Sequence, residues 1–220
     1  MNNSKAPYII IYEDKDILVV YKKRDVLTIR TSDKMTFTHN LYHYLKLYLE
    51  KKKENLFIVH RLDYETSGLL IFAKSSIMKG KIQKAFEEHL VIREYEGVIK
   101  EKIPLGKRFH VDQYLLDDDS KVVISDSSLG KEAITDIESI NYINIGTAIK
   151  INITTGRRNQ IRLAIHSLNL TLLGDKRYSF SIEKRMYLNA YHLSFPADLG
   201  LKQSDFFLTP LWIKETNSKN

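Results

Sequence analysis

Cysteine is absent from the 220-residue chain. Its absence excludes disulfide frameworks, zinc sites built on cysteine ligands and thiol catalysis. Proline and glycine are scarce, with four and nine residues, and no Pro-rich or Gly/Ser-rich linker, internal repeat or low-complexity tract is present. The sequence therefore predicts one α+β domain over residues 1–220.

Long apolar runs are also missing. The N-terminal segment has only one short apolar stretch, Tyr8–Tyr12, before acidic residues begin, which is too short for a signal peptide. No other run approaches the length of a membrane span. We therefore expect a soluble cytoplasmic protein.

The charge balance is basic. Thirty-four Lys and Arg face twenty-seven Asp and Glu, which leaves a formal charge of +7. An excess of this sign favours association with a polyanion such as a nucleic acid. Many basic proteins bind no polyanion, so the charge alone leaves the question open.

Residue periodicity predicts a β-rich chain with few helices. Tyr8–Tyr12 and Ile17–Tyr21 read as a hairpin with a polar turn. Further strands are expected over 56–59, 69–73, 91–99, 134–140, 147–153, 186–195 and 206–211. Helices are expected over 38–53, from Ser75 or Ser76 to about His89, and over 158–168. The second helix should bury Ile77, Ile82, Ala85 and Phe86, and residues 100–131 read as loops with short strands.

A charged loop between apolar runs is the first candidate for chemistry. Asp63 lies in the polar stretch between the expected strands 56–59 and 69–73. A partly desolvated carboxylate there needs a guanidinium partner to remain ionised. A second segment, Thr154–Leu163, supplies three arginines, and the spacing of Arg158 and Arg162 predicts one helical face. Judged on residue types alone, a loop Asp is more often a cap or turn residue, and clustered arginines are usually a solvated surface.

The order of the residues in these segments changes that balance. The run His60-Arg61-Leu62-Asp63-x-x-Thr66-Ser67-Gly68-Leu69-Leu70 closely resembles the signature loop of the RluA family of pseudouridine synthases. Thr155-Gly156-Arg157-Arg158-Asn159-Gln160-Ile161-Arg162, followed by Leu172-Leu173-Gly174-Asp175-x-x-Tyr178, is similar to a second block of that family. Weaker similarity extends from Tyr12 to Pro196, so the resemblance covers most of the chain.

The resemblance implies a pseudouridine-synthase-like fold, with a mainly antiparallel mixed sheet, flanking helices and an active-site cleft. It implies an isomerase that detaches the uracil of a uridine in ribosomal or transfer RNA, rotates it and rejoins it through carbon, without cofactor or metal. Asp63 matches the family nucleophile, which can attack covalently and later leave; whether it attacks the sugar or the base stays open. By the same resemblance Arg162 pairs with Asp63, and Tyr95 stacks on the target base and offers a hydroxyl for proton transfer.

The resemblance also implies a set of substrate-binding residues. Arg61 would fill the space left by a flipped-out nucleotide. His60 could serve as a base, but hydrogen bonds that shape the loop are the favoured role. The full set is His60, Arg61, Leu62, Thr66, Gly68, Arg157, Gln160 and Leu163. A monomer is usual in the family.

Two departures from the family pattern lie beside these residues. Lys22-Lys23-Arg24-Asp25 stands where the family usually carries Lys-Pro, a small residue and Gly, and Arg158-Asn159 replaces the usual Thr-His. Both changes alter loop stiffness or charge, so substrate choice is expected to differ. The chain also begins too close to the catalytic region to hold the separate N-terminal RNA-binding domain of some relatives, so recognition is expected from this domain or from a partner.

Other functions remain as alternatives. His39 and His43 have a spacing that can bind zinc, but neither a following Glu nor a Cys completes a site. A catalytically silent RNA-binding relative, acting as a folding aid or regulator, would keep the fold; intact Asp63, Tyr95 and Arg162 favour an active enzyme instead. An enzyme acting on a small uracil glycoside is disfavoured by the basic charge.

Overall fold

The computed structural model describes residues 6–118 and 121–213. Residues 1–5, 119–120 and 214–220 fall outside these ranges. The chain divides into two compact units, which we describe separately. Of the described residues, the first unit contains 6–91 and 193–206, and the second contains 92–118, 121–192 and 207–213.

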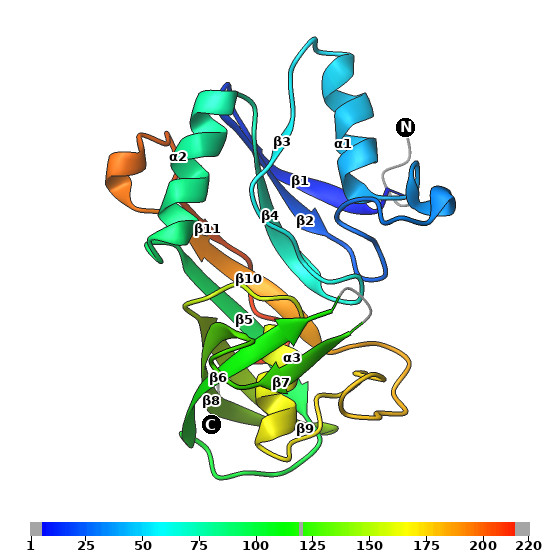
Figure 1. Cartoon of the computed structure of the whole chain (residues 1–220), viewed down its shortest axis with the longest axis vertical. Coiled ribbons are helices and arrows are strands. Elements are labelled where there is room, and N and C mark those ends of the chain that lie inside the picture. The colour runs from blue at the N-terminus through cyan, green and yellow to red at the C-terminus, as the bar shows by residue number, and fades with distance from the viewer. Residues whose placement is uncertain (1–5, 119–120, 214–220) are drawn as a thin grey trace, which may run out of the picture. The chain divides into compact units, whose positions relative to one another are not determined.

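The first unit is built on a small antiparallel sheet (Figure 1). The expected hairpin is confirmed as β1 (Tyr8–Glu13) and β2 (Ile17–Lys22), and β2 pairs with β4 (Ser67–Ala73). The short β3 (Phe57–Ile58) also pairs with β4. Every residue of β4 is buried. The strand therefore lacks the alternation of apolar and polar side chains that marks a strand with one solvated face.

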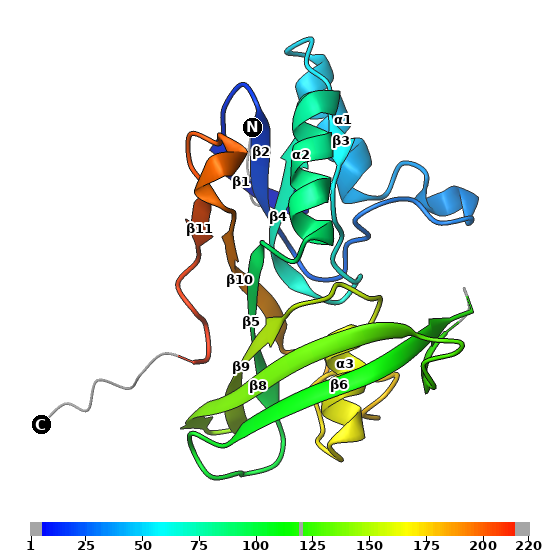
Figure 2. The same cartoon turned by 60° about the vertical axis from the view of Figure 1, so that its left-hand side comes forward.

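Two helices lie on one face of this sheet, as both side views show (Figures 1 and 2). Helix α1 spans Leu41–Glu50 and α2 spans Ser76–Glu87. Helix α1 begins later than expected, because Asn40 caps it by accepting a hydrogen bond from the backbone N–H of His43. Helix α2 begins where expected, since Ser75 accepts from the N–H of Met78, and it ends two residues earlier than expected. The buried face of α2 consists of Met78, Ile82 and Ala85.

The expectation that Ile77 would be buried is wrong, since its side chain is 75% exposed. Met78, Ile82 and Ala85 follow one another at spacings of four and three and share the buried face of the helix, and Ile77 lies off that face. Two 3-10 turns, η1 (Lys34–Thr36) and η2 (Ala197–Leu199), lie in this unit. The short β11 (Asp205–Phe207) pairs with β10 (Leu188–Ser194).

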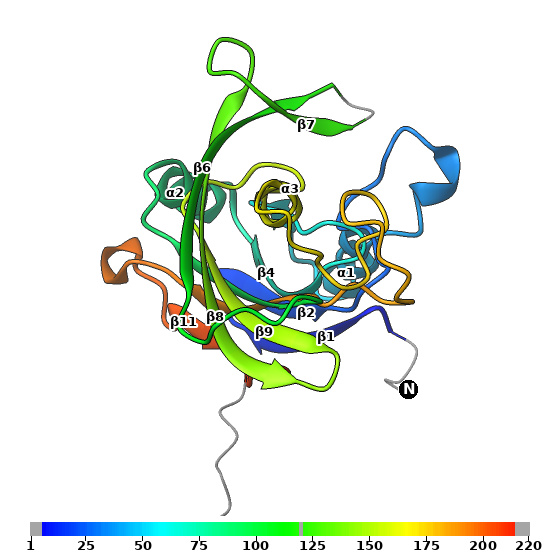
Figure 3. The ribbon, with the colours of Figure 1, turned by 90° about the horizontal axis from the view of Figure 1, so that it is seen from below.

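The second unit is a larger sheet. Its strands are β5 (Ile92–Ile99), β6 (Arg108–Asp117), β7 (Val122–Ser125), β8 (Lys131–Ile143), β9 (Gly146–Ile153) and β10 (Leu188–Ser194), in the order β10-β5-β9-β8-β6-β7. The pairs from β5 through to β7 are antiparallel. Helix α3 (Gln160–Ser167) packs along one face of β6 and β8 (Figure 3).

Residues 100–131 are more ordered than the sequence predicts. The ten-residue β6 occupies the middle of this stretch and pairs with β8 over most of its length. Strand β6 buries Val111, Gln113 and Leu115 in alternation. Gln113 is polar although it is buried, so the sequence does not show the alternation of apolar and polar residues that is typical of a strand. The partner strand β8 also lies outside the local sequence window, so a local pattern does not predict β6.

The expected fold class is confirmed as α+β with a mainly antiparallel sheet. Within the described ranges, no helix is long and apolar enough to cross a membrane.

Candidate active site

The signature loop of the first unit is held on both sides of Asp63. The Thr28 hydroxyl donates to the Leu62 carbonyl at 2.8 Å and accepts from the Leu62 N–H at 3.2 Å. The N–H of Val26 donates to the carbonyl of Tyr64 at 3.2 Å. Both neighbours of Asp63 are therefore tied to the segment after β2, which fixes the backbone that carries the half-buried carboxylate.

Lys22 joins the same two segments from within. Its side chain is fully buried, and Nζ donates to the carbonyls of Lys23, Val26 and Tyr64 at 3.1, 2.7 and 3.1 Å. Burial lowers the pKa of Lys22 to about 7, although the nearby negative charges of Asp63, Asp25 and Glu65 act in the opposite direction. The amine is thus electrostatically coupled to Asp63 and supports the turn of its loop.

The departure from the family pattern after Lys22 keeps an unusual backbone turn. Asp25 stands where the family usually has Gly, and it adopts a left-handed conformation with φ of 60°. Asp is one of the few residues that tolerate this region, because its short polar side chain can hydrogen-bond locally. Asp25 can therefore occupy a backbone conformation that glycine also adopts readily.

The remaining loop residues divide into exposed and structural ones. His60 accepts a hydrogen bond through Nε2 from the N–H of Ile71 in β4 at 3.1 Å, and this contact joins the loop to the strand. Thr66 and Gly68 are buried at the start of β4, and Leu62 is buried as well. Arg61 is exposed, so it is free to reach solvent from the loop.

In the second unit, Tyr95 lies in β5 and is 8% exposed. Arg93 is two residues away and is also buried, so the two side chains lie on the same face of the strand. The guanidinium of Arg93 donates to the carbonyl of Thr154, just before the arginine-rich block. Burial lowers the pKa of Arg93, while the charge of Tyr95 raises it and that of Arg157 lowers it further.

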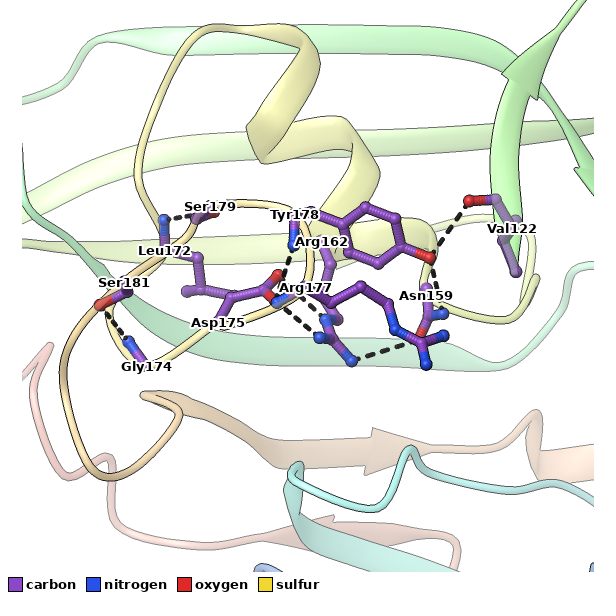
Figure 4. A network of polar contacts seen from close by, with 10 residues as sticks. All are labelled: Val122, Asn159, Arg162, Leu172, Gly174, Asp175, Arg177, Tyr178, Ser179 and Ser181. Carbon is purple, nitrogen blue, oxygen red and sulfur yellow. Dashed lines mark hydrogen bonds and ion pairs between the residues drawn. The ribbon is translucent and has the colours of Figure 1, made fainter. Parts of the chain in front are cut away.

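Arg162 is buried in α3 and forms a bidentate ion pair with Asp175 (Figure 4). Its Nε donates to Asp175 Oδ2 at 3.0 Å and its Nη2 donates to Oδ1 at 2.6 Å. Asp175 is itself fully buried, so the pair exchanges charge-assisted hydrogen bonds in a region of low polarity. Sequence reasoning gave Asp175 no role, although its place in the second family block was the signal that could have found it.

Asn159 and Tyr178 extend this pair toward β7. Asn159 Oδ1 accepts from Arg162 Nη1 at 3.3 Å, and its Nδ2 donates to the Tyr178 hydroxyl at 2.9 Å. That hydroxyl donates to the carbonyl of Val122 at 3.2 Å, and the Tyr178 ring lies 5.2 Å from the Arg162 guanidinium (Figure 4). The guanidinium orientation of Arg162 is therefore fixed from three sides.

Arg158 does not lie on the helix with Arg162, which corrects the expected shared face. Helix α3 begins at Gln160, because Asn159 adopts a left-handed conformation with φ of 56° before it. Arg158 Nη2 instead pairs with Asp117 Oδ1 at the end of β6, at 2.6 Å. The second departure from the family pattern thus ties the turn before α3 to the adjacent hairpin.

The other predicted residues of this block are placed as follows. Gln160 is buried, donates to Ile134 O and Thr135 Oγ1, and accepts from Thr155 Oγ1 and Arg157 N–H. All of its hydrogen-bonding capacity is used within the protein, so it braces the turn against β8. Arg157 is exposed and donates through Nε to Glu132 O at 2.9 Å. Leu163 is buried in an apolar cluster with Leu115, Val122 and Ala133.

The predicted catalytic residues are divided between the units: Asp63 belongs to the first, and Tyr95 and Arg162 belong to the second. His39 was considered above as a metal ligand. Its Nδ1 lies 3.0 Å from the carbonyl oxygen of Met35, which can only accept a hydrogen bond, and 3.1 Å from the Thr38 hydroxyl. Across the described part of the chain, no group of three or more His, Cys, Asp or Glu side chains could hold a metal ion.

Comparison with known proteins decides the family. The model of the RNA pseudouridylate synthase family matches residues 16–167, which is more than half of the chain. The chain belongs to the RNA pseudouridylate synthase family. This confirms the resemblance read from the signature loop and from the arginine-rich block, both of which lie within the matched residues.

Several curated members of the family are similar in sequence. Two proteins named ribosomal large subunit pseudouridine synthase D, from Vibrio cholerae and Vibrio parahaemolyticus, are 31% and 32% identical over 176 residues. In both cases the match covers 78% of this chain and 53% of the relative. The chain therefore spans about half the length of the curated relatives that it matches.

Solved structures show the same fold. Human RNA pseudouridylate synthase domain containing 4 matches with a TM-score of 0.72 at 20% identity, covering 91% of this chain and 87% of the human one. Human RNA pseudouridylate synthase domain containing 1 matches with a TM-score of 0.70 at 22% identity, covering 92% and 83%. The expected pseudouridine-synthase fold is confirmed by these matches.

Proposed function

We propose that this family member converts a specific uridine of ribosomal or transfer RNA to pseudouridine. Family membership supports the reaction class. The formal charge of +7 supports a polyanionic substrate. The Vibrio relatives are named for the large ribosomal subunit, which makes ribosomal RNA the first substrate to test.

Asp63 is the proposed nucleophile. The observation that carries this role is the fixation of its loop, in which both Leu62 and Tyr64 are hydrogen-bonded to the segment after β2. A carboxylate that forms a covalent bond to a nucleotide gains rate from a fixed approach, because the entropy of positioning is lost before the reaction. Since the target atoms are buried in a stacked helix, the uridine must first be flipped out of it.

The other two catalytic roles are carried over from the family. Tyr95 is proposed to stack on the flipped uracil and to offer its hydroxyl for proton transfer. Arg162 is proposed to hold the Asp63 carboxylate in its anionic form. The role of Arg162 is supported by its burial and by the hydrogen bonds of Asp175 and Asn159, which hold the guanidinium in one orientation.

The substrate-binding residues follow the same reasoning. Arg61 and Arg157 are exposed and are proposed to contact the RNA directly. His60, Leu62, Thr66, Gly68, Gln160 and Leu163 are buried or half-buried, and we propose that they act by shaping the two segments that carry the catalytic residues.

The test is conversion of uridine in total RNA from a strain that lacks the gene. Wild-type protein is expected to form pseudouridine, and Asp63→Asn is expected to abolish it while RNA binding persists. Asp33→Asn is the matched control, because Asp33 is an exposed carboxylate of the same unit that only caps η1. Mapping the pseudouridines in stable RNA with and without the gene would identify the target.

The outcomes separate the alternatives. Unchanged conversion by Asp63→Asn would remove Asp63 from the mechanism. RNA binding by wild-type protein without any pseudouridine would instead identify a catalytically silent RNA-binding relative.

A further inference from the structure

The segment after Asp175 exposes apolar side chains that the reaction does not use. We call Lys176–Arg185 the basic loop; it belongs to the second unit and precedes β10. Phe180 is 80% exposed and Ile182 is 95% exposed, which makes them the most exposed large apolar side chains in the described ranges. Two such side chains so close together cost free energy in water unless they meet a partner.

The base of the basic loop is firmly held (Figure 4). The Ser179 hydroxyl accepts from Leu172 N–H at 3.2 Å, and the Ser181 hydroxyl accepts from Gly174 N–H at 2.9 Å. Ser181 N–H also donates to the Asp175 carbonyl at 3.0 Å. The residues on both sides of Phe180 are thus anchored to the preceding segment, and the ring between them is directed to solvent.

The backbone at Phe180 is strained. Its φ of 51° lies in the left-handed region, where Cβ of an ordinary residue approaches the following carbonyl oxygen. A bulky residue there is a true outlier that persists only when its surroundings enforce it. The chain therefore carries two costs, strain and apolar exposure, to hold one aromatic ring in solvent.

The loop that carries this ring is rich in positive charge. Lys176, Arg177 and Lys184 are exposed in the basic loop, against one half-buried acidic residue, Glu183. Arg185 is already engaged, since its guanidinium lies over the rings of Tyr187 and Trp212 at 4.6 and 5.1 Å. An exposed aromatic ring in a loop with exposed cations complements a chain of bases and phosphates.

We propose that the basic loop is a contact surface for unpaired RNA. A base stacks on Phe180, Ile182 covers the edge of that base, and Lys176, Arg177 and Lys184 hold the adjacent phosphates. Single-stranded RNA is the partner that fits, because a duplex hides the faces of its bases in the stack. This inference rests on the proposed function, in which RNA is the substrate. It adds the place on the protein where unpaired nucleotides of that RNA bind.

The test measures binding without turnover, in full-length protein carrying Asp63→Asn. The probes are a fluorescein-labelled single-stranded RNA 12-mer of mixed sequence and a duplex of the same length. Stacking of one base on an aromatic side chain contributes about 1–3 kcal/mol. Phe180→Ala is therefore expected to raise Kd for the single strand by about tenfold, since each 1.4 kcal/mol is a factor of ten. Binding of the duplex should change little.

Two further variants separate stacking from backbone effects. Phe180→Trp keeps an aromatic face and is expected to bind as tightly as wild type. Phe180→Gly relieves the strain at φ of 51°, so it should melt at a higher temperature than Phe180→Ala but bind the single strand as weakly. Ile77→Ala is the matched control, because Ile77 is a highly exposed apolar residue of α2 in the other unit.

Activity provides a second measurement in the protein with Asp63 intact. Loss of a stacking contact that substrate and transition state share should raise KM and leave kcat unchanged. Lys176→Gln should lower the slope of log Kd against log salt concentration by the amount that about one phosphate contact contributes.

The results that would overturn the inference are distinct from failure of the proposed function. Equal single-strand affinity for wild type and Phe180→Ala would overturn it and would leave a protein partner as the reason for the exposed ring. An equal loss for single strand and duplex, or a fall in kcat alone, would overturn it as well. A protein that binds RNA through Phe180 but forms no pseudouridine would refute the proposed reaction and leave the loop assignment standing.

Discussion

At the scale of single residues, several positions in the second family block are fixed by contacts that only the fold reveals. In the sequence Asp175 was only one position of the second family block. In the structure it is the bidentate partner of Arg162. Gly174 precedes it with φ of 80°, and a Cβ at this position would lie 1.6 Å from the carbonyl oxygen of Arg185. Glycine is required there by both the backbone conformation and the space.

Gly174→Ala is therefore predicted to be severely destabilising, by roughly 3 kcal/mol or more, because a backbone carbonyl cannot move aside cheaply. Chemical denaturation measures the free energy of unfolding. Gly80→Ala is the matched control, since Gly80 lies exposed within α2 with nothing near its missing Cβ. This second change should stabilise the protein by about 0.5–1 kcal/mol. Comparable stability of the two variants would contradict the assigned role of Gly174.

At the scale of elements, a group of charges joins β1, α1 and β4 in the first unit. Glu13, at the end of β1, accepts from Tyr48 of α1 at 2.8 Å, from Lys52 at 2.7 Å and from Lys74 at 2.8 Å. Lys74 is nearly buried and also pairs with Glu54 at 2.7 Å. Burial of Glu13 alone would raise the pKa of its carboxyl, but the hydrogen bonds from Lys52, Lys74 and Tyr48 outweigh it and lower the pKa to about 2.

The lowered pKa predicts a loss of stability in acid. The stabilising contribution of Glu13 is fully present above its unfolded pKa of 4.5 and is lost as the pH falls from there toward 2. Glu13→Gln should remove this part of the pH dependence and cost on the order of 1 kcal/mol at pH 7, because solvent screens the group. Thermal melting between pH 7 and pH 2.5 measures both effects. Parallel curves for wild type and variant would exclude the ionic contribution.

At the scale of the whole molecule, the chain is basic and forms two units with mainly antiparallel strands. Residues 207–213, called here the C-terminal segment, belong to the second unit. Glu96 of β5 is fully buried, and its carboxylate accepts from the N–H groups of Leu211 and Trp212 at 2.7 and 2.8 Å. Asn189 of β10 donates to the same carboxylate at 3.1 Å. Residues more than a hundred positions apart are thus joined by one side chain.

Glu96→Ala is predicted to release the C-terminal segment. Each hydrogen bond to a charged group contributes about 1.5–3 kcal/mol, and the amides of Leu211 and Trp212 would lose theirs. Hydrogen exchange at these two amides should accelerate by at least tenfold while exchange in β8 and β9 stays slow. Glu96→Gln, which keeps an acceptor oxygen, should show a smaller increase. Unchanged exchange in Glu96→Ala would show that other contacts hold the segment.

Prediction from sequence succeeded where the signal was local. The β1–β2 hairpin, the strands β4, β5 and β9, and the three α-helices follow from short periodic runs and capping residues, and the structure confirms them. Prediction failed for β6 and for the start of α3, because the first depends on a distant partner strand and the second on the left-handed conformation of Asn159. A single domain over 1–220 stays a prediction.

The sequence by itself determined the family and the residues expected to perform the chemistry, because the order of side chains in two short blocks is specific without knowledge of their contacts. Only the tertiary structure decided how those blocks are held. The three carbonyls around Lys22, the Asp175 partner of Arg162 and the anchored serines beside Phe180 come from residues that the chain brings together on folding. Hydrogen bonds and burial depend on distance in space, and residue order does not specify that distance.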